Sequence, residues 1–363
     1  MEEAAKLRLS IKNKFIVLFL VGSILLSPTT ISAAEELEII TAIEKVLAEN
    51  NELEIAGLRL ENAKFDYQKS RADNLTTKSK RAKLEAKINY LEAQEQYYNQ
   101  QSQLLQETLN NYTAVLLQQK EIELAKKKRE LEAHRLDKVQ SKLEQGHSNS
   151  VAVTEQLNDY QDAEFNLEQA KDNYQQGQRE LKFILELNKK SDLNIADLSQ
   201  PSPQENHLTA IIEQGIKNNL GLEIKTENIK LAQQNLKQSQ QVATAALDLK
   251  QIKNRVKIAK LEEKNAKQEL KNQLHANYQE LEQAVNQLEL REQNLAQVKE
   301  NYSLVQAREK KELASQEEIL AAEVQLLEAE YNYSQAVVDY YQQQLELKVT
   351  MQLETEELIN GLQ

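Results

Sequence analysis

The sequence between Arg81 and Gln145 contains neither proline nor glycine. Apolar residues recur in it every few positions, in the heptad pattern of a helix that packs lengthwise against other helices. These positions are Leu84, Ile88, Leu91, Tyr98, Leu105, Leu109, Tyr112 and Leu116. At 1.5 Å per residue, the segment predicts one helix on the order of 100 Å long. That is far longer than the helices of an ordinary globular domain.

A second stretch carries the same heptad pattern later in the chain. Its apolar positions are Leu274, Tyr278, Leu281, Val285, Leu288, Leu295, Val298, Tyr302 and Val305. Composition agrees with long helices, because the 363 residues include no tryptophan, only seven glycines and only three prolines. Ala, Leu, Glu, Gln and Lys dominate instead, and these residues favour helix. The predicted fold class is therefore all-α.

Breaks in the helical pattern are few. In the segment Gln145–Ser150, Gly146 can end a helix in a left-handed turn, and Asn149 or Ser150 can cap the next helix. We therefore predict a tight reversal there. Pro201 and Pro203 forbid helix in a second segment, residues 193–207, which predicts an extended connector.

The two heptad stretches belong to an internal duplication. A shift of 166 residues superimposes Val153 on Ile319, Ala163 on Ala329, Ala170 on Ala336, Tyr174 on Tyr340, Leu181 on Leu347 and Leu187 on Leu353. Earlier in each half, a shift of 169 residues matches Ala63 with Ala232 and Ser70 with Ser239. Each half is predicted to run helix, turn, very long helix, tip and return helix.

The N-terminus is typical of a secretory signal. Four basic residues precede an apolar run from Phe15 to Ser27, and the small residues Ser32, Ala33 and Ala34 offer a cleavage site. An uncleaved anchor is the alternative, although the run is shorter than the roughly 20 residues that span a bilayer. We expect residues 1–33 to be the signal peptide. Residues 34–192 are then the first hairpin repeat, 193–207 the linker and 208–363 the second repeat.

Several function classes are disfavoured. A net charge of −12 repels nucleic acid. Without cysteine, the chain has no disulfide, thiol nucleophile or thiolate metal site. His134, His147, His207 and His275 are scattered without partners at metal-ligand spacing, and no phosphate loop or serine elbow occurs. The prediction is a non-enzyme without a cofactor.

The duplicated pattern resembles the TolC family of outer-membrane efflux proteins over essentially the whole exported sequence. A tip glycine, a short cap and regularly placed aliphatic, Ala and Tyr positions carry the resemblance. They are Gly146, Asn149, Val153, Ala163, Ala170 and Tyr174 in the first copy, and Ser315, Ile319, Ala322, Ala329, Ala336 and Tyr340 in the second. The pairs Asn50-Asn51 and Asn218-Asn219 are similar to the family's Asn-Pro-x-Leu helix entry, with Glu52 and Leu220 where proline is usual.

The resemblance implies a homotrimer whose long helices form a hollow cylinder across the periplasm, continued by a β-barrel in the outer membrane. Its periplasmic end would dock onto an adaptor protein and an inner-membrane transporter, and the duct would be a passive conduit for small molecules or proteins. Three copies of two similar halves would close a pseudo-sixfold ring. We therefore expect an exported protein of the outer membrane or periplasm.

One departure concerns the strands that family members insert between the first and second helices of each half. A membrane-spanning strand needs about 9 to 11 residues of alternating polarity. The segments at these places, 72–84 and 241–253, are too short for a strand pair and lack aromatic residues. A strand stub at 242–244 is the most we expect. The predicted fold is two tandem repeats of very long antiparallel helical hairpins, a TolC-like helical barrel with the β-barrel absent or reduced to short stubs. Membrane association is left open.

The hairpin tips are candidate adaptor-docking sites, because the resembled family docks there. Gly146 and His147 mark the first tip. Glu312 and Leu313 mark the second, and Glu312 stands where the family has its second tip glycine. That difference puts the usual adaptor recognition in question at the second tip.

A candidate entrance ring of acidic residues lies next to the second tip. Glu318 falls on an acidic ring position of the family, with Glu317 beside it, whereas Ala321 lacks the charge of another such position. A ring of carboxylates would attract cations and resist closure. The alternative is that Ser315 and Glu318 form a capping box, which would use the same side chain.

Two further patterns have structural interpretations. Tyrosines at helical spacing are expected to pack between helices rather than to form a ligand strip. They are Tyr97, Tyr98, Tyr112, Tyr160, Tyr174, Tyr331, Tyr333, Tyr340 and Tyr341. The basic run 126–130 is predicted to be a solvated helix face.

A TolC-like export duct is the leading hypothesis, and two alternatives remain open. A secreted coiled-coil scaffold or spacer would have the same helices without a lumen. The sequence does not separate these, because it does not distinguish an inner polar helix face from an outer one. An adaptor protein also has a long hairpin, but it would need flanking β-rich domains that the sequence does not show.

Overall fold

The computed structural model describes residues 36–187, 193–203, 207–242 and 244–362. The predicted signal peptide lies outside these residues. Residues Leu37–Gln363 form one compact unit. In its described part, helices are joined by turns and an extended connector, and the β-structure consists of one isolated parallel bridge between Leu37 and Ile195. The predicted all-α fold is confirmed.

Four helices occur in the same order in each half of the unit. The first half has α2 (Ile39–Glu49), α3 (Asn51–Thr77), α4 (Lys80–Glu144) and α5 (Ser150–Ile184), and the second has α6 (Leu208–Asn218), α7 (Leu220–Gln241), α8 (Ala246–Glu309) and α9 (Gln316–Thr350), followed by α10 (Thr355–Ile359). Corresponding long helices have 65 and 64 residues, and both return helices have 35. The predicted pair of long hairpins is confirmed.

An asparagine separates the first two helices of each half. The side chain of Asn50 accepts a hydrogen bond from the N–H of Leu53 at 2.9 Å, and that of Asn219 accepts one from Leu222 at 2.8 Å. Both are N-caps of the longer helix that follows. The two caps lie 169 residues apart, which is the shift found in the sequence for this part of the repeat.

Short turns connect α3 to α4 and α7 to α8. The first consists of Lys78, whose φ is +54°, and Ser79, which caps α4. At the second, Val242 has extended backbone angles. Neither Val242 nor Thr244 belongs to a strand, and Ala243 of the predicted stub lies outside the described residues. The described part of each turn therefore keeps neighbouring helices antiparallel without an inserted strand.

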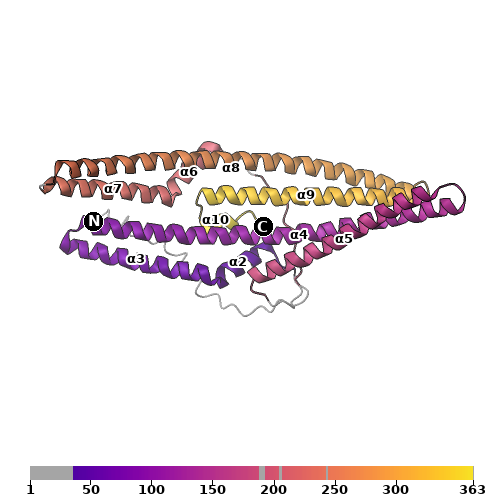
Figure 1. Ribbon diagram of the computed structural model, residues 1–363, viewed down its shortest axis with the longest axis horizontal. Helices are drawn as coiled ribbons and strands as arrows, with labels where there is room; N and C mark the ends of the chain where they lie inside the picture. The colour runs from indigo at the N-terminus through magenta and orange to yellow at the C-terminus, as the bar shows by residue number, and fades with distance from the viewer. Residues whose placement is uncertain (1–35, 188–192, 204–206, 243, 363) are drawn as a thin grey trace. The chain divides into compact units, whose positions relative to one another are not determined.

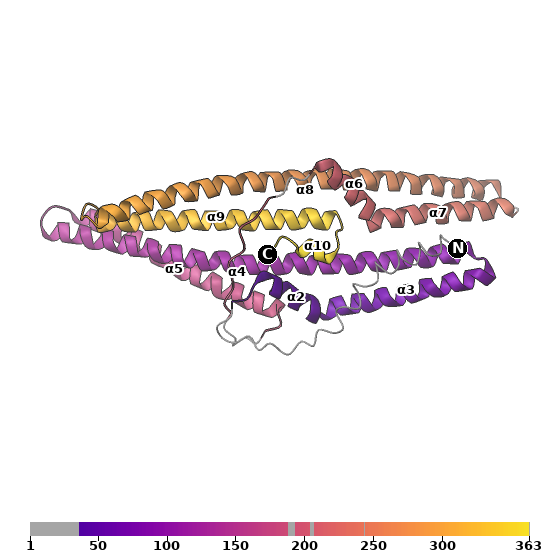
Figure 2. The same cartoon turned by 180° about the vertical axis from the view of Figure 1, so that it is seen from behind.

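The long helices lie side by side within the unit Leu37–Gln363. α4 packs against its own return helix α5 and also against α9 of the second half, and α8 packs against α9. Figures 1 and 2 show α9 between α8 and α4, with α5 on the other side of α4. Beyond these helices, α3 packs on α4, and α7 packs on both α4 and α8. As a result α3 and α5 form one edge of the packed helices, and α8 forms the other.

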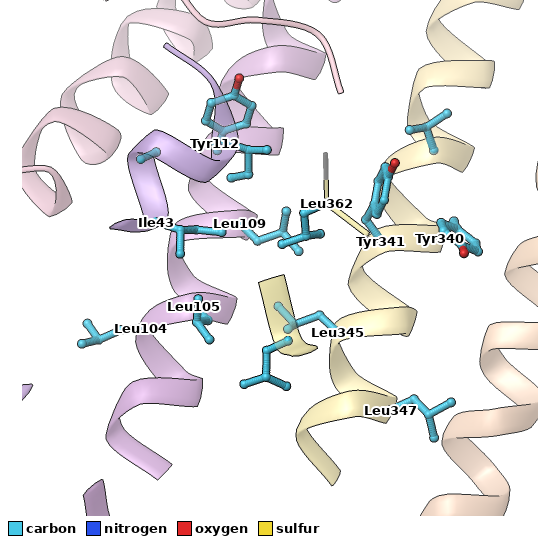
Figure 3. Close-up of a cluster of buried hydrophobic side chains, with 14 of the residues drawn as sticks. Ile43, Leu104, Leu105, Leu109, Tyr112, Tyr340, Tyr341, Leu345, Leu347 and Leu362 are labelled. Atoms are coloured by element: carbon cyan, nitrogen blue, oxygen red, sulfur yellow. The ribbon is translucent and has the colours of Figure 1, made fainter. Parts of the chain in front are cut away.

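The largest core lies between α4 and α9 and includes α2 and the C-terminal residues (Figure 3). Its most deeply buried side chains include Ile43, Leu105, Leu109, Tyr112, Tyr341, Leu345 and Leu362. Full burial of each such aliphatic side chain contributes roughly 1.5–3 kcal/mol. The two halves are therefore held together by a shared core.

Tyrosine hydroxyls fix the connector between the halves to this core. The hydroxyl of Tyr112 lies 2.7 Å from the carbonyl oxygens of both Leu37 and Ala196. The hydroxyl of Tyr341 donates to the carbonyl of Ser199 at 3.0 Å. The Leu37 carbonyl also accepts the N–H of Ala196 at 3.0 Å, so the hydroxyl of Tyr112 adds to the bridge that holds the connector, and the hydroxyl of Tyr341 pairs a carbonyl of the connector itself.

Candidate functional site

The first hairpin tip is a short glycine-containing turn between α4 and α5. Gly146 has a φ of +76°, and the N–H of His147 donates to the carbonyl of Lys142 at 2.8 Å. This is the left-handed turn predicted from the sequence. Asn149 caps α5 by accepting a hydrogen bond from the N–H of Ala152 at 2.9 Å. His147 is exposed at the tip.

The second tip has the same backbone without a glycine. Glu312 has a φ of +59°, and the N–H of Leu313 donates to the carbonyl of Arg308 at 2.9 Å. Arg308 in turn donates from its guanidinium to the carbonyl of Leu313 at 3.0 Å. The side chain of Leu313 is exposed. The tips therefore present one backbone shape with different side chains.

Glu318 takes part in the capping box that was the alternative to the entrance ring. The N–H of Ser315 donates to its carboxylate at 2.8 Å, and the N–H of Glu318 donates to the Ser315 hydroxyl at 3.3 Å. The hydrogen bond from the Ser315 backbone lowers the pKa of Glu318, and the charge of Arg308 lowers it further. The capping box is thus confirmed, and it occupies the carboxylate that a free acidic ring would need.

Glu317 is bound to the first hairpin. Its carboxylate accepts hydrogen bonds from Lys138 at 2.6 Å and from Arg135 at 3.2 Å, both on α4. The hydrogen bond from Lys138 is the main reason that the pKa of Glu317 is lowered. Its negative charge is therefore matched by two cations within the same chain.

Further ion pairs join α4 and α9 along the same contact. Lys127 lies 2.9 Å from Glu323, and Lys128 lies 2.6 Å from Glu328. The basic run 126–130 was predicted to be a solvated helix face, and the ion pairs of these two lysines with α9 were not predicted because their acidic partners are distant in sequence. Their heads remain partly exposed, so each pair contributes only about 0–1 kcal/mol and fixes alignment more than stability.

The histidines and tyrosines lie largely as expected. His147, His207 and His275 are exposed and His134 is half-buried. Among the described residues there is no group of acidic residues and histidines able to hold a metal ion. Several tyrosines pack in or against the main core, namely Tyr97, Tyr98, Tyr112, Tyr174, Tyr333, Tyr340 and Tyr341. Their predicted packing between helices is confirmed.

Exposed large apolar side chains are concentrated on the helices at the edges of the layer, and sequence patterns do not reveal this feature. On one edge they are Ile55, Leu58, Phe65 and Leu75 of α3 with Val151, Leu157, Phe165 and Phe183 of α5; on the other they are Leu247, Ile258, Leu261, Leu290 and Leu304 of α8. The residues on α8 follow one another at intervals of 11, 3, 29 and 14 residues, each close to a whole number of helical turns. They therefore form one stripe along α8. Within a sequence rich in heptads, nothing marks such a stripe as exposed until the helix order is known.

Solved structures that share this fold include outer-membrane channels. The alignment with the outer-membrane channel OprN covers 86% of this chain and 89% of that one, at 12% identity and a TM-score of 0.62. VceC, an outer membrane protein of Vibrio cholerae, aligns over 86% of this chain and 95% of its own, at 11% identity and a TM-score of 0.60. The CmeC outer membrane channel of Campylobacter jejuni aligns over 90% of both chains, at 12% identity and a TM-score of 0.59.

At the level of sequence, the chain matches no protein-family model and no curated protein. The resemblance to TolC-family efflux channels is confirmed as a likeness of fold. No helix in the described part of the chain combines the length and apolarity required to cross a bilayer.

Proposed function

We propose that copies of this chain assemble side by side into a TolC-like duct through which solutes leave the cell. The supporting observation is the pair of apolar edges. The helices form a layer whose inner members α4 and α9 are covered on both sides, whereas α3, α5 and α8 carry exposed apolar side chains outward. Exposed apolar side chains aligned along one face of a helix are typical of a face that packs against a partner.

The layer has two different edges, and this favours a closed ring over a filled bundle. The α3/α5 edge and the α8 edge belong to different halves, so two copies meet head to tail when one edge packs on the other. A head-to-tail contact generates a ring if the rotation closes. A homotrimer with two hairpins per copy fits the fold, since the six hairpins would then be nearly equivalent.

The remaining parts of the proposal follow from the fold of the neighbouring channels. Residues 1–33 would be removed on export. The repeats 34–192 and 208–363, joined by the linker 193–207, would form the wall of a passive conduit in the periplasm or outer membrane. The tips at Gly146-His147 and Glu312-Leu313 would dock a periplasmic adaptor that leads to an inner-membrane transporter. Glu317 and Glu318 would line the entrance as partly neutralised carboxylates.

The mass and shape of the purified full chain test this proposal. Light scattering after gel filtration should give three times the mass of one chain, and negative-stain electron micrographs should show rings with a central hole. A monomer or antiparallel dimer would contradict the duct. A solid filament without a central hole would favour the coiled-coil spacer instead.

A further inference from the structure

The internal repeat identifies which faces of two copies should meet. Within one chain, the long helix α4 of the first half packs on α9 and α7 of the second half. The repeat makes α8 the counterpart of α4, and it makes α5 and α3 the counterparts of α9 and α7. If the same contact recurs between copies, α8 of one copy packs on α5 and α3 of the next.

The shifts that relate the two halves are fixed by the structure. Gly146 and Glu312, the two left-handed tip residues, lie 166 residues apart, and so do Glu186 and Gln352, which end α5 and α9 with φ values of +51° and +50°. The N-caps at the starts of α3 and α7 lie 169 residues apart. Because each helix is continuous, these shifts assign every residue its counterpart.

Near the tips, the α4–α9 contact uses charge, and its counterparts have lost all four cations and two of the three carboxylates, with Asp162 left at the place of Glu328. The cations Lys127, Lys128, Arg135 and Lys138 bind acidic residues of α9, and their counterparts on α8 are Gln293, Asn294, Asn301 and Leu304. On α5, Val151 stands at the counterpart of Glu317 and Leu157 at that of Glu323. The pair Lys138–Glu317 thus corresponds to Leu304 and Val151, which are 60% and 63% exposed.

All four exposed apolar residues of α5 correspond to α9 residues that lie against α4. Val151 and Leu157 take the places of the ion-paired Glu317 and Glu323. Phe165 takes the place of Tyr331, which lies close enough to Glu121 of α4 for that charge to act on it. Phe183 takes the place of Val349, whose carbonyl accepts a hydrogen bond from Tyr98 of α4.

The correspondence continues toward the other end of the layer. Ile224 of α7 is only 7% exposed because it packs on Ile88 and Leu91 of α4, whereas its counterpart on α3, Ile55, is 48% exposed. Leu124 of α4 is 8% exposed against α9, and its counterpart on α8, Leu290, is 53% exposed. Each exposed residue would be covered by repeating the in-chain contact.

From this pattern we infer that the contact between copies is an apolar seam in which Leu304 of one copy packs against Val151 of the next. The inference rests on the proposed ring and specifies the two faces that build it. At the counterparts of Lys138–Glu317 and Lys127–Glu323, charge is lost on both sides of the seam, so neither side would bury an unpaired ion there. The ring then has two chemically different seams, an ionic one within each chain and an apolar one between chains.

The two seams should respond differently to salt. Exposed ion pairs weaken as salt screens them, whereas apolar burial does not. High salt should therefore loosen α4 from α9 near the tips and leave the copies associated.

Cysteine crosslinking tests the seam, because the natural chain has no cysteine. The full chain carrying Leu304→Cys and Val151→Cys is treated with a short bismaleimide at a concentration where the natural chain is associated. Closed covalent multimers, with dimers as intermediates, are expected. The matched control carries Lys138→Cys and Glu317→Cys and should give only internally crosslinked single chains.

The outcomes separate the seam from the ring. Light scattering could find several associated chains while the Leu304→Cys, Val151→Cys variant gives no covalent multimers. This result would contradict the proposed Leu304–Val151 contact and leave the proposed ring standing. If the natural chain stays monomeric, both proposals are overturned. Multimers that form from this variant and not from the control support the seam.

A charge-insertion series measures the same contact without crosslinking. Leu304→Lys alone should weaken association by on the order of tenfold, because an unpaired ammonium must then be covered. Adding Val151→Glu should restore association in low salt and make it sensitive to salt, as in the α4–α9 contact. Both positions are exposed in the single chain, so circular dichroism should show unchanged helix content. If Leu304→Lys has no effect on association, the seam is contradicted.

Discussion

The long helices α4 and α8 have nearly the same length and the same place in the repeat, yet they have different surroundings. α4 is covered by second-half helices along a face that α8 leaves open. The covered face carries basic residues and leucines with partners in the same chain, and the open face carries leucines without partners. The two repeats share the same backbone, and the side chains on each long helix differ according to the helices that pack against it.

Leu124 of α4 and Leu290 of α8 occupy the same position of the repeat, and the largest expected effect comes from truncating Leu124. Leu124→Ala should lower the free energy of unfolding by about 3 kcal/mol, because it opens a cavity against Leu320 and Val324 of α9. Chemical denaturation followed by circular dichroism measures this loss.

The matched variant is Leu290→Ala. Its side chain is exposed in the single chain, so unfolding of dissociated chains should change by less than about 0.5 kcal/mol. Association between copies should weaken instead, as measured by sedimentation. Equal losses of unfolding free energy in the two variants would show that α8 is covered within one chain after all.

A buried ion cluster is a second difference between the two repeats, because only the second repeat supplies its carboxylate. Glu227 of α7 is almost fully buried and lies 2.6 Å from Lys87 of α4 and 2.9 Å from Lys230, whereas its counterpart on α3 is Leu58. Lys87→Ala should cost about 2 kcal/mol of unfolding free energy, since it leaves a buried carboxylate with one partner. The Glu227→Leu, Lys87→Met double variant should recover most of this loss, and failure to recover it would mean that the charges themselves are required.

The same cluster predicts loss of stability in acid. Burial alone would raise the pKa of Glu227, but hydrogen bonds from Lys87 and Lys230 outweigh it and hold the pKa below the usual 4.5. A carboxylate with a lowered pKa in the folded state stabilises the fold above the unfolded value and loses that contribution as pH falls through the folded value. Unfolding free energy should therefore decline below about pH 4.5, and the decline should be shallower in Glu227→Gln. An identical pH dependence in both proteins would contradict this assignment.

Tyr112 and Tyr278 occupy corresponding positions of the two repeats, 166 residues apart, and have different surroundings. Tyr112 is fully buried, and its hydroxyl reaches the carbonyls of Leu37 and Ala196, whereas Tyr278 is half-buried and interacts with Glu282. Tyr112→Phe should lower unfolding free energy by about 1.5 kcal/mol because the hydrogen bond that the buried hydroxyl makes to these carbonyls is lost. Tyr278→Phe should cost less than about 0.5 kcal/mol. Thermal melts of both variants make the comparison, and a larger effect at Tyr278 would contradict it.

Sequence patterns were sufficient for features that depend on local residues. The uninterrupted heptads predicted the long helices, Gly146 predicted the turn, Asn149 was one of two predicted caps of α5, and the Ser315–Glu318 capping box was one of two alternatives for Glu318. Contacts between distant segments were not predictable in this way. The partners of Glu317 are 179 and 182 residues away, and only the packing of α9 on α4 brings them together. Likewise, Leu124 and Leu290 occupy the same repeat position in the sequence, and the difference in their burial comes from helix order.

The smallest expected effect concerns the two tips. Glu312 and Gly146 share a left-handed backbone, which costs a residue with a side chain roughly 1–2 kcal/mol more than it costs glycine. Part of this strain is offset because glycine loses more conformational freedom on folding. Glu312→Gly should therefore stabilise the chain by about 0.5 kcal/mol, and Gly146→Ala should destabilise it by a similar or slightly larger amount. Opposite shifts in melting temperature, with helix content unchanged, would bear out the equivalence of the tips. Destabilisation by Glu312→Gly would instead mean that the Glu312 side chain contributes a stabilising contact of its own.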